Sequence, residues 1–208
     1  MIYKIFKIIM DFLLSLIGII ILSPIFLVCI IWIKLDSKGP VLFKQKRVGK
    51  DKKLFYIWKF RTMRIDTPSD TPTHLLSNPD QWITKSGKFL RKTSLDELPQ
   101  IFNILQGKMS IIGPRPALWN QYDLIDERDK YGANDILPGL TGYAQIKGRD
   151  ELIIADKAKL DGYYKQNMNL WLDIKIFFGT IISVLKSDGV VEGKQNRDEK
   201  DIEKWKGY

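Results

Sequence analysis

Two adjacent carboxylates, Asp96 and Glu97, are the strongest candidates for chemistry in this chain; they lie in the segment RKTSLDELPQIFNIL. Ser94 and Glu97 form the Ser-x-x-Glu pattern of a capping box, which predicts that Ser94 is the N-cap of a helix over residues 94–105. Asp96 then lies in the first turn, where the helix dipole favours a negative charge. Such a pair can bind Mg²⁺, which takes one or two carboxylates plus substrate phosphates. The alternative is that both acids only cap the helix.

Phosphate-binding features flank this pair in the sequence. In SIIGPRP, Gly113 and two prolines form a rigid turn that presents Arg115, and PGLTGYAQIKGR combines three glycines with Arg149. Glycines allow a ligand to approach the backbone closely, and arginines bind phosphate oxygens. Further basic residues are Lys59, Lys85, Lys88, Arg91 and Lys92. Taken singly, these are ordinary turns and solvated cations, but together with the acids they indicate metal-dependent phosphoryl transfer on a lipid phosphate.

The composition excludes several kinds of catalytic site. Among the 208 residues there are one cysteine, Cys29, and one histidine, His74, so an internal disulfide is impossible. A Cys/His zinc site and a triad that relies on several histidines are not expected either. Lys and Arg number 33 against 24 Asp and Glu, a formal net charge of +9. This excess predicts an anionic partner: nucleic acid, anionic lipid or a phosphorylated substrate.

An uncharged run of 22 residues, FLLSLIGIIILSPIFLVCIIWI, occupies residues 12–33. As a helix it would extend ~33 Å, enough to cross a bilayer core. Ser23-Pro24 interrupts it at its midpoint, and proline removes the bond to the Ile20 carbonyl, so a kink is expected. Two lysines precede the run, and nine basic residues against one acidic residue follow in segment 44–64. Because cytoplasmic flanks are basic, a re-entrant helix is favoured, with a kinked spanning helix as the alternative.

The remaining chain predicts a small strand element and several helices. Strands are expected at residues 41–43 and 54–58, joined by a turn at 47–51, with loops at 66–79 and 137–149. Helices are expected at 94–105, 117–131, 155–166 and 170–186. The last helix is apolar over most of its circumference, as in a core helix or one at a membrane interface with Trp171 at headgroup depth. The predicted fold class is α+β: mostly helical and monotopic, with a re-entrant N-terminal helix and interfacial amphipathic helices.

The order and spacing of these motifs resemble the bacterial sugar transferases, the small monotopic phosphoglycosyl transferases that start polyprenol-linked glycan assembly. Matching stretches run from Ser23-Pro24 through KQKRVG, KFRTM, RKTSLDELPQ, GKMSIIGPRP, PGLTGYAQIKGR and NLWLDIKI, over roughly residues 1–187. The resemblance implies the minimal catalytic form and supports a re-entrant helix broken at Ser23-Pro24. Tyr143 and Lys147 stand where many relatives carry Trp and Asn, which leaves the sugar undetermined.

The resemblance also implies a ping-pong reaction with Mg²⁺. Asp96 matches the nucleophile, which takes a phosphosugar from a UDP-sugar, releases UMP and passes the phosphosugar to polyprenyl phosphate. Glu97 is its dyad partner, and both acids are the implied metal ligands. Asp173, in WLD, matches an acid near the active site. The residues implied to contact phosphates and nucleotide are Lys59, Arg91, Arg115 and Arg149.

These inferences predict a membrane helix and junction at residues 1–38, a catalytic domain at 39–191 and a charged tail at 192–208. The domain is expected on the cytoplasmic face of the bacterial inner membrane, with UDP-sugar, polyprenyl phosphate and membrane lipid as partners; homo-oligomerisation stays open. One alternative is a membrane-anchored basic protein that binds anionic lipid or nucleic acid, which requires basic residues interleaved with exposed aromatics. The basic residues instead cluster with glycines and acids, so no nucleic-acid partner is expected. Another alternative is a diphosphatase that uses water as acceptor.

Overall fold

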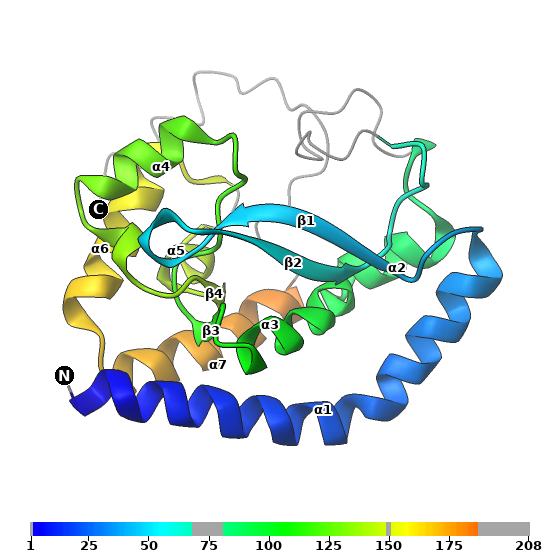
Figure 1. Cartoon of the computed structure of the whole chain (residues 1–208), viewed down its shortest axis with the longest axis horizontal. Helices are drawn as coiled ribbons and strands as arrows, with labels where there is room; N and C mark the ends of the chain where they lie inside the picture. The colour runs from blue at the N-terminus through cyan, green and yellow to red at the C-terminus, as the bar shows by residue number, and fades with distance from the viewer. Residues whose placement is uncertain (1, 68–80, 149–150, 187–208) are drawn as a thin grey trace.

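A computed structural model describes residues 2–67, 81–148 and 151–186 of the chain. Within these residues the fold is mostly helical with two small sheets, which confirms the predicted α+β class (Figure 1). The elements are α1 (Ile2–Asp36), β1 (Leu42–Val48), η1 (Lys50–Lys52), β2 (Leu54–Phe60), α2 (Lys85–Lys92), η4 (Leu95–Gln100), α3 (Ile101–Leu105), β3 (Ser110–Ile112), α4 (Tyr122–Asp129), η5 (Ala133–Asp135), β4 (Gly139–Thr141), α5 (Tyr143–Ile146), α6 (Ile154–Asn167) and α7 (Leu170–Lys186).

Helix α1 follows one edge of the molecule and is long and apolar enough to cross a membrane. Pro24 lies inside it. The Ser23 hydroxyl donates to the Ile20 carbonyl at 2.8 Å, which is the acceptor that a proline at position 24 leaves without a backbone donor. Figure 1 shows α1 changing direction in its second half, the half that contains this Ser-Pro pair.

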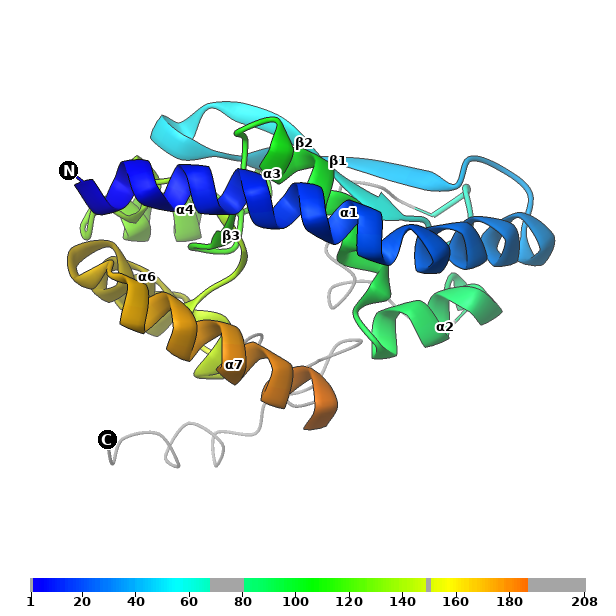
Figure 2. The same cartoon turned by 90° about the horizontal axis from the view of Figure 1, so that it is seen from below.

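In α1, polar side chains are buried and apolar side chains are exposed, which is the reverse of the pattern in an amphipathic helix of a soluble protein. Lys7, Asp11 and Ser15, spaced by four residues, are buried, whereas most of its large apolar side chains are exposed. Seen from below, α1 and α7 lie together on one face of the molecule (Figure 2). Their exposed apolar side chains include Ile20, Leu27, Trp171, Phe178 and Ile182, and we call this surface the apolar face. So large an exposed apolar surface is typical of contact with a membrane or a protein.

Strands β1 and β2 form an antiparallel hairpin whose inner face points into the molecule. The register pairs Phe43 with Lys59 and Arg47 with Phe55, and directly paired residues lie on the same face of a sheet. Phe55 belongs to a buried cluster, so Lys59 and Arg47 share the side of the hairpin that packs on the interior. The strands are longer than predicted: residues 47 and 48 belong to β1 rather than to the turn, because they pair with Phe55 and Leu54 of β2.

The prediction of an α-helix capped by Ser94 was wrong. Ser94 adopts a left-handed conformation with φ 57° and makes no side-chain cap, and the next six residues form the 3₁₀ helix η4. Pro99 explains the difference, since it has no N–H for an α-helical bond to Leu95 and its ring would crowd that carbonyl. The α-helix starts only at Ile101, so Asp96 and Glu97 lie in a tight 3₁₀ turn rather than in the first turn of an α-helix.

Residues 137–149 were wrongly predicted as one loop, since they contain β4 and α5. Strand β4 pairs in parallel with β3, and the pairing requires glycine: a Cβ on Gly139 would lie 2.1 Å from the backbone nitrogen of Gly113. Gly113 and Gly139 therefore permit two segments of the chain to approach each other, and the expected ligand contact stays a prediction. Helix α4 is shorter than the predicted 117–131, and α2 was not predicted; α6 and α7 confirm the last two predicted helices.

Candidate active site

The hairpin and η4 bring Lys59 to the acidic pair. Lys59 Nζ lies 2.7 Å from Glu97 Oε1 and 3.9 Å from Asp96 Oδ2. Lys59 reaches these acids because β2 places it on the inner face of the hairpin, and β2 packs beside η4. The structure therefore places Lys59 at the acidic pair, across 38 residues of sequence, and its contact with substrate phosphates stays a prediction.

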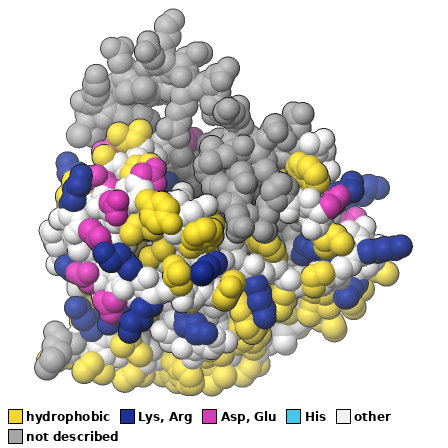
Figure 3. All heavy atoms as spheres, turned by 45° about the horizontal axis from the view of Figure 1, so that its top comes forward, with side chains coloured by type: hydrophobic (Ala, Val, Ile, Leu, Met, Phe, Trp, Pro, Cys, Tyr) yellow, Lys and Arg dark blue, Asp and Glu magenta, His cyan; other side chains and the backbone are white. Residues whose placement is uncertain are grey.

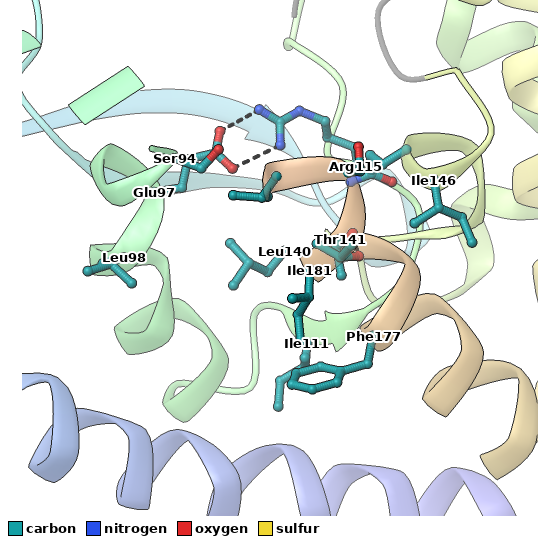
Figure 4. Close-up of a pocket in the computed structure, with 14 residues that line it drawn as sticks. Ser94, Glu97, Leu98, Ile111, Arg115, Leu140, Thr141, Ile146, Phe177 and Ile181 are labelled. Carbon is teal, nitrogen blue, oxygen red and sulfur yellow. Dashed lines mark hydrogen bonds and ion pairs between the residues drawn. The ribbon is translucent and has the colours of Figure 1, made fainter. Parts of the chain in front are cut away.

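Arg115 holds Glu97 in a two-pronged ion pair. Its Nη1 donates to Glu97 Oε2 at 3.0 Å and its Nη2 to Oε1 at 2.5 Å (Figure 4). Arg115 follows β3 in a turn between two prolines, and the β3–β4 pairing fixes where that turn lies. Such a fork binds planar oxyanions with defined geometry, whether a carboxylate or a phosphate.

The two acids have opposite electrostatic environments. Burial raises the pKa of Asp96 to about 6, with the Glu97 charge adding to the rise and Lys59 and Arg91 opposing it. Burial also acts to raise the pKa of Glu97, but Arg115 and Lys59 outweigh it and hold that pKa well below its usual range. Glu97 is thus a fixed anion, whereas Asp96 is a buried carboxylate whose charge is poorly compensated. The positive charge of Arg91, another predicted site residue, therefore acts on Asp96.

Arg47 is a residue of this site to which the sequence assigned no role. Its Nη1 donates to the Pro116 carbonyl at 3.0 Å and its Nη2 to Gln45 Oε1 at 2.6 Å, which braces the segment that carries Arg115. Among the described residues its Nε is buried without a hydrogen-bond partner. Burial and the Arg115 charge lower its pKa to about 9, against an opposing effect of Glu97. Only the hairpin register shows that Arg47 faces this site, because KQKRVG contains two other cations that the sequence does not distinguish from it.

A cavity of about 200 Å³ adjoins the Glu97–Arg115 pair. Its walls are mostly apolar and come from η4, β3, β4, α5 and α7, as Figure 4 shows with Leu98, Ile111, Leu140, Phe177 and Ile181. Gln145 also lines it, and both polar atoms of its side-chain amide are buried without a partner in the described structure. A buried amide without partners is costly, so this position favours a ligand that can bond it.

The structure does not bring Asp173 to the acidic pair. Asp173 Oδ2 accepts from Lys7 Nζ at 2.6 Å and from Tyr3 at 2.7 Å, and Oδ1 accepts from Tyr164 at 2.7 Å. These contacts join the start of α1 to α6 and α7. Asp173 therefore belongs to a separate network, and its predicted role near the reaction stays a prediction. Arg149 and His74 lie outside the described residues, as does the predicted tail at 192–208.

The carboxylates of this site can bind Mg²⁺ only if substrate oxygens supply the remaining ligands. No group of three or more His, Cys, Asp or Glu side chains that could hold a metal occurs among residues 2–67, 81–148 and 151–186. Asp96 and Glu97 supply two neighbouring carboxylates, and both Glu97 oxygens already accept from Arg115. This matches the usual Mg²⁺ site of one or two carboxylates plus substrate phosphates, rather than a cage built by the protein alone.

Comparison with known proteins defines the class of this site. The family model described as "Bacterial sugar transferase" matches residues 2–187, and the chain belongs to that family, which confirms the resemblance. The chain is 40% identical over 190 residues to the "UDP-glucose:undecaprenyl-phosphate glucose-1-phosphate transferase" of Klebsiella pneumoniae, which covers 85% of this chain and 39% of that protein.

Two further relatives show the range of the family. The chain is 40% identical over 198 residues to the "UDP-N-acetylgalactosamine-undecaprenyl-phosphate N-acetylgalactosaminephosphotransferase" of Aeromonas hydrophila, covering 90% of this chain and 45% of the relative. It is 41% identical over 169 residues to the "Uncharacterized sugar transferase EpsL" of Bacillus subtilis, covering 81% of each. The chain thus spans about two fifths of the length of the Klebsiella relative and most of the Bacillus one.

Proposed function

We propose that this protein transfers a sugar 1-phosphate from a UDP-sugar to polyprenyl phosphate. The observation that carries the proposal is the contrast between its two acids: Glu97 is held by Arg115 and Lys59, while Asp96 is buried beside it with a raised pKa. A weakly compensated carboxylate next to fixed cations suits nucleophilic attack on a phosphate. The names of two relatives support the substrates, since each names a UDP-sugar and undecaprenyl phosphate.

The reaction then proceeds in two displacements on one phosphorus atom. An Asp96 oxygen attacks the β-phosphorus of the UDP-sugar, the bond to the bridging oxygen breaks, and UMP leaves with that oxygen. A phosphate oxygen of the lipid next attacks the same phosphorus, and the bond to Asp96 breaks to restore the carboxylate. Arg115, Lys59 and Arg91 bind the diphosphate oxygens and offset the charge that builds up on them.

We further propose that Mg²⁺ binds with Asp96, Glu97 and the donor diphosphate, where it neutralises phosphate charge. We expect EDTA to abolish UMP release and added Mg²⁺ to restore it. Because the protein alone offers two carboxylates, Mg²⁺ with UDP should raise the thermal unfolding temperature, whereas Mg²⁺ alone should change it little. Full activity in EDTA, or an equal shift with Mg²⁺ alone, would contradict this site.

The apolar face supports attachment to a bilayer. Figure 3 shows hydrophobic side chains along the lower edge of the molecule, where α1 lies in Figure 1, and Lys and Arg side chains above them. We propose that α1 enters and leaves the membrane on the same side, with its bend at Ser23-Pro24, so that the catalytic part lies on the cytoplasmic face. The long apolar helix and membership of the family support membrane association.

The deciding experiment is UMP release by the detergent-purified protein with Mg²⁺ and a panel of UDP-sugars, with and without undecaprenyl phosphate. We expect turnover that requires the lipid, a stoichiometric burst of UMP without it, and loss of both in Asp96→Asn. Continuous release of UMP and sugar phosphate without lipid would indicate a diphosphatase instead. Turnover by Asp96→Asn would rule out Asp96 as nucleophile.

A further inference from the structure

The cavity beside Glu97 and Arg115 joins the charged site to the apolar face. Phe177 and Ile181 of α7 line the cavity, yet their side chains are 49% and 42% exposed, so they also border the outer surface. Phe178 and Ile182, the next residue after each, point outward on the apolar face with 58% and 54% exposure. A ligand that approaches from the lipid side would therefore meet the cavity through α7.

The walls of the cavity select for an apolar chain with one polar end. Leu98, Ile111, Leu140 and Ile146 line its interior together with Thr141 and Thr180, whose hydroxyls bond each other at 2.7 Å, and Glu97 and Arg115 lie at one end. A nucleotide or sugar carries many hydroxyl and carbonyl groups, and apolar walls would leave most of these without hydrogen bonds. A prenyl phosphate, by contrast, matches both the apolar walls and the arginine.

The unpartnered Gln145 amide is an independent sign of a ligand. Its Nε2 and Oε1 are both buried without a hydrogen-bond partner in the described structure, although Gln145 lines the same cavity. A ligand oxygen that enters the cavity within reach of Nε2 would accept from it and reduce this cost. The cavity thus contains an unused hydrogen-bond donor in addition to the Arg115 guanidinium.

We propose that this cavity binds the first isoprenyl units of the acceptor lipid, with the lipid phosphate directed toward Arg115 and Asp96. The inference rests on the proposed function and adds where the acceptor binds and what selects it. Phe177 and Ile181 form the wall that contacts the chain. The uridine and sugar of the donor lie outside the cavity in this assignment, whereas the donor diphosphate and, after UMP has left, the lipid phosphate use the same Arg115.

Filling the cavity tests this assignment, because the two half-reactions separate donor from acceptor. Ile181→Trp should keep the UMP burst amplitude with donor alone within twofold of the wild type. Its apparent KM for undecaprenyl phosphate should rise at least tenfold. Ile182→Trp makes the same change on the outward face of the same helix and should leave both quantities within twofold.

Two outcomes would overturn the assignment. If Ile181→Trp loses the burst while its unfolding temperature is unchanged, the cavity binds the donor. If neither the burst nor the KM changes, the cavity is not used. Should Ile181→Trp fold poorly, Phe177→Ala removes bulk instead of adding it, and the same KM rise with an intact burst is expected.

A binding readout separates this inference from failure of the proposed function. A diazirine-bearing prenyl phosphate should label the segment 177–184, and undecaprenyl phosphate should compete with it better than undecaprenol. If no UDP-sugar releases UMP but this labelling occurs, the lipid site stands and the transferase proposal fails. Labelling confined to α1 would reject the lipid site.

Discussion

At the residue scale, neighbouring carboxylates in η4 differ because of their partners. Glu97 accepts from both Arg115 and Lys59, so its negative charge stabilises the fold. Asp96 is 9% exposed, and Lys59 is 3.9 Å away, so its charge is buried with less compensation. The raised pKa of Asp96 means that the folded state disfavours its ionised form, whereas the lowered pKa of Glu97 means the opposite.

Neutralising each acid should therefore change stability in opposite directions. Glu97→Gln leaves Arg115 and Lys59 without their shared anion and should lower the free energy of unfolding by about 3 kcal/mol, as expected when a buried ion pair loses one partner. Asp96→Asn removes a poorly compensated charge and should leave stability unchanged or raise it. Thermal unfolding in detergent at a pH of about 7.5, above the raised pKa of Asp96, would measure both. Equal losses in the two variants would contradict the opposite electrostatic environments of the two acids.

At the element scale, the bend of α1 depends on proline chemistry. Pro24 supplies no N–H, and the Ser23 hydroxyl occupies the Ile20 carbonyl instead. In the proposed membrane placement of α1, the helix thereby avoids an unsatisfied acceptor where no water could bond it. The Ser23-Pro24 pair therefore both interrupts the backbone hydrogen bonds and supplies the hydroxyl that lowers the free-energy cost of the interruption.

Pro24→Ala should restore the backbone bond to Ile20 and straighten α1. A straight helix of this length favours spanning, so the N-terminus should move to the opposite side of the membrane. We would place a cysteine before residue 2 in a Cys29→Ser background and measure its labelling by an impermeant thiol reagent in spheroplasts. Labelling is expected for Pro24→Ala and not for the parent. Labelling of the parent itself would contradict the re-entrant arrangement.

At the scale of the whole molecule, one buried network joins the start of α1 to the far end of the described chain. Asp173 accepts from Tyr3, Lys7 and Tyr164, and Asp11 accepts from the backbone N–H of Ile111 at 3.1 Å. The network therefore holds α1 beside α7 and fixes β3, the strand that precedes Arg115. The two helices of the apolar face are kept together by polar contacts on their inner sides.

Asp173→Asn should loosen this junction without acting on the reaction directly. The amide would place a donor against Lys7 or the tyrosines, so we expect a loss of about 3 kcal/mol in the free energy of unfolding. The UMP burst per folded molecule should stay within twofold of the parent. Asp156→Asn, at an exposed acid of α6, serves as the control and should change neither quantity. A slower burst with unchanged stability would instead place Asp173 in the reaction.

The sequence by itself determined the features that depend on local chemistry. The apolar run with its Ser-Pro pair, the helices α6 and α7 and the adjacent acids all follow from spacing and residue type. The family motifs then grouped Lys59, Arg91 and Arg115 with Asp96 and Glu97, and the structure brings these five together. Local signals succeed here because each depends on a few neighbouring residues.

Only the tertiary structure decided how distant segments meet. The β3–β4 pairing is three residues long and depends on backbone contact between Gly113 and Gly139, which no local pattern reveals. The 3₁₀ turn at η4 was not predicted, because the capping-box pattern of Ser94 and Glu97 favours an α-helix, whereas Pro99 prevents one. Long-range packing also decides the role of Arg47, the separate network of Asp173 and the apolar cavity. In each case the role of a residue depends on partners that are far away in the sequence.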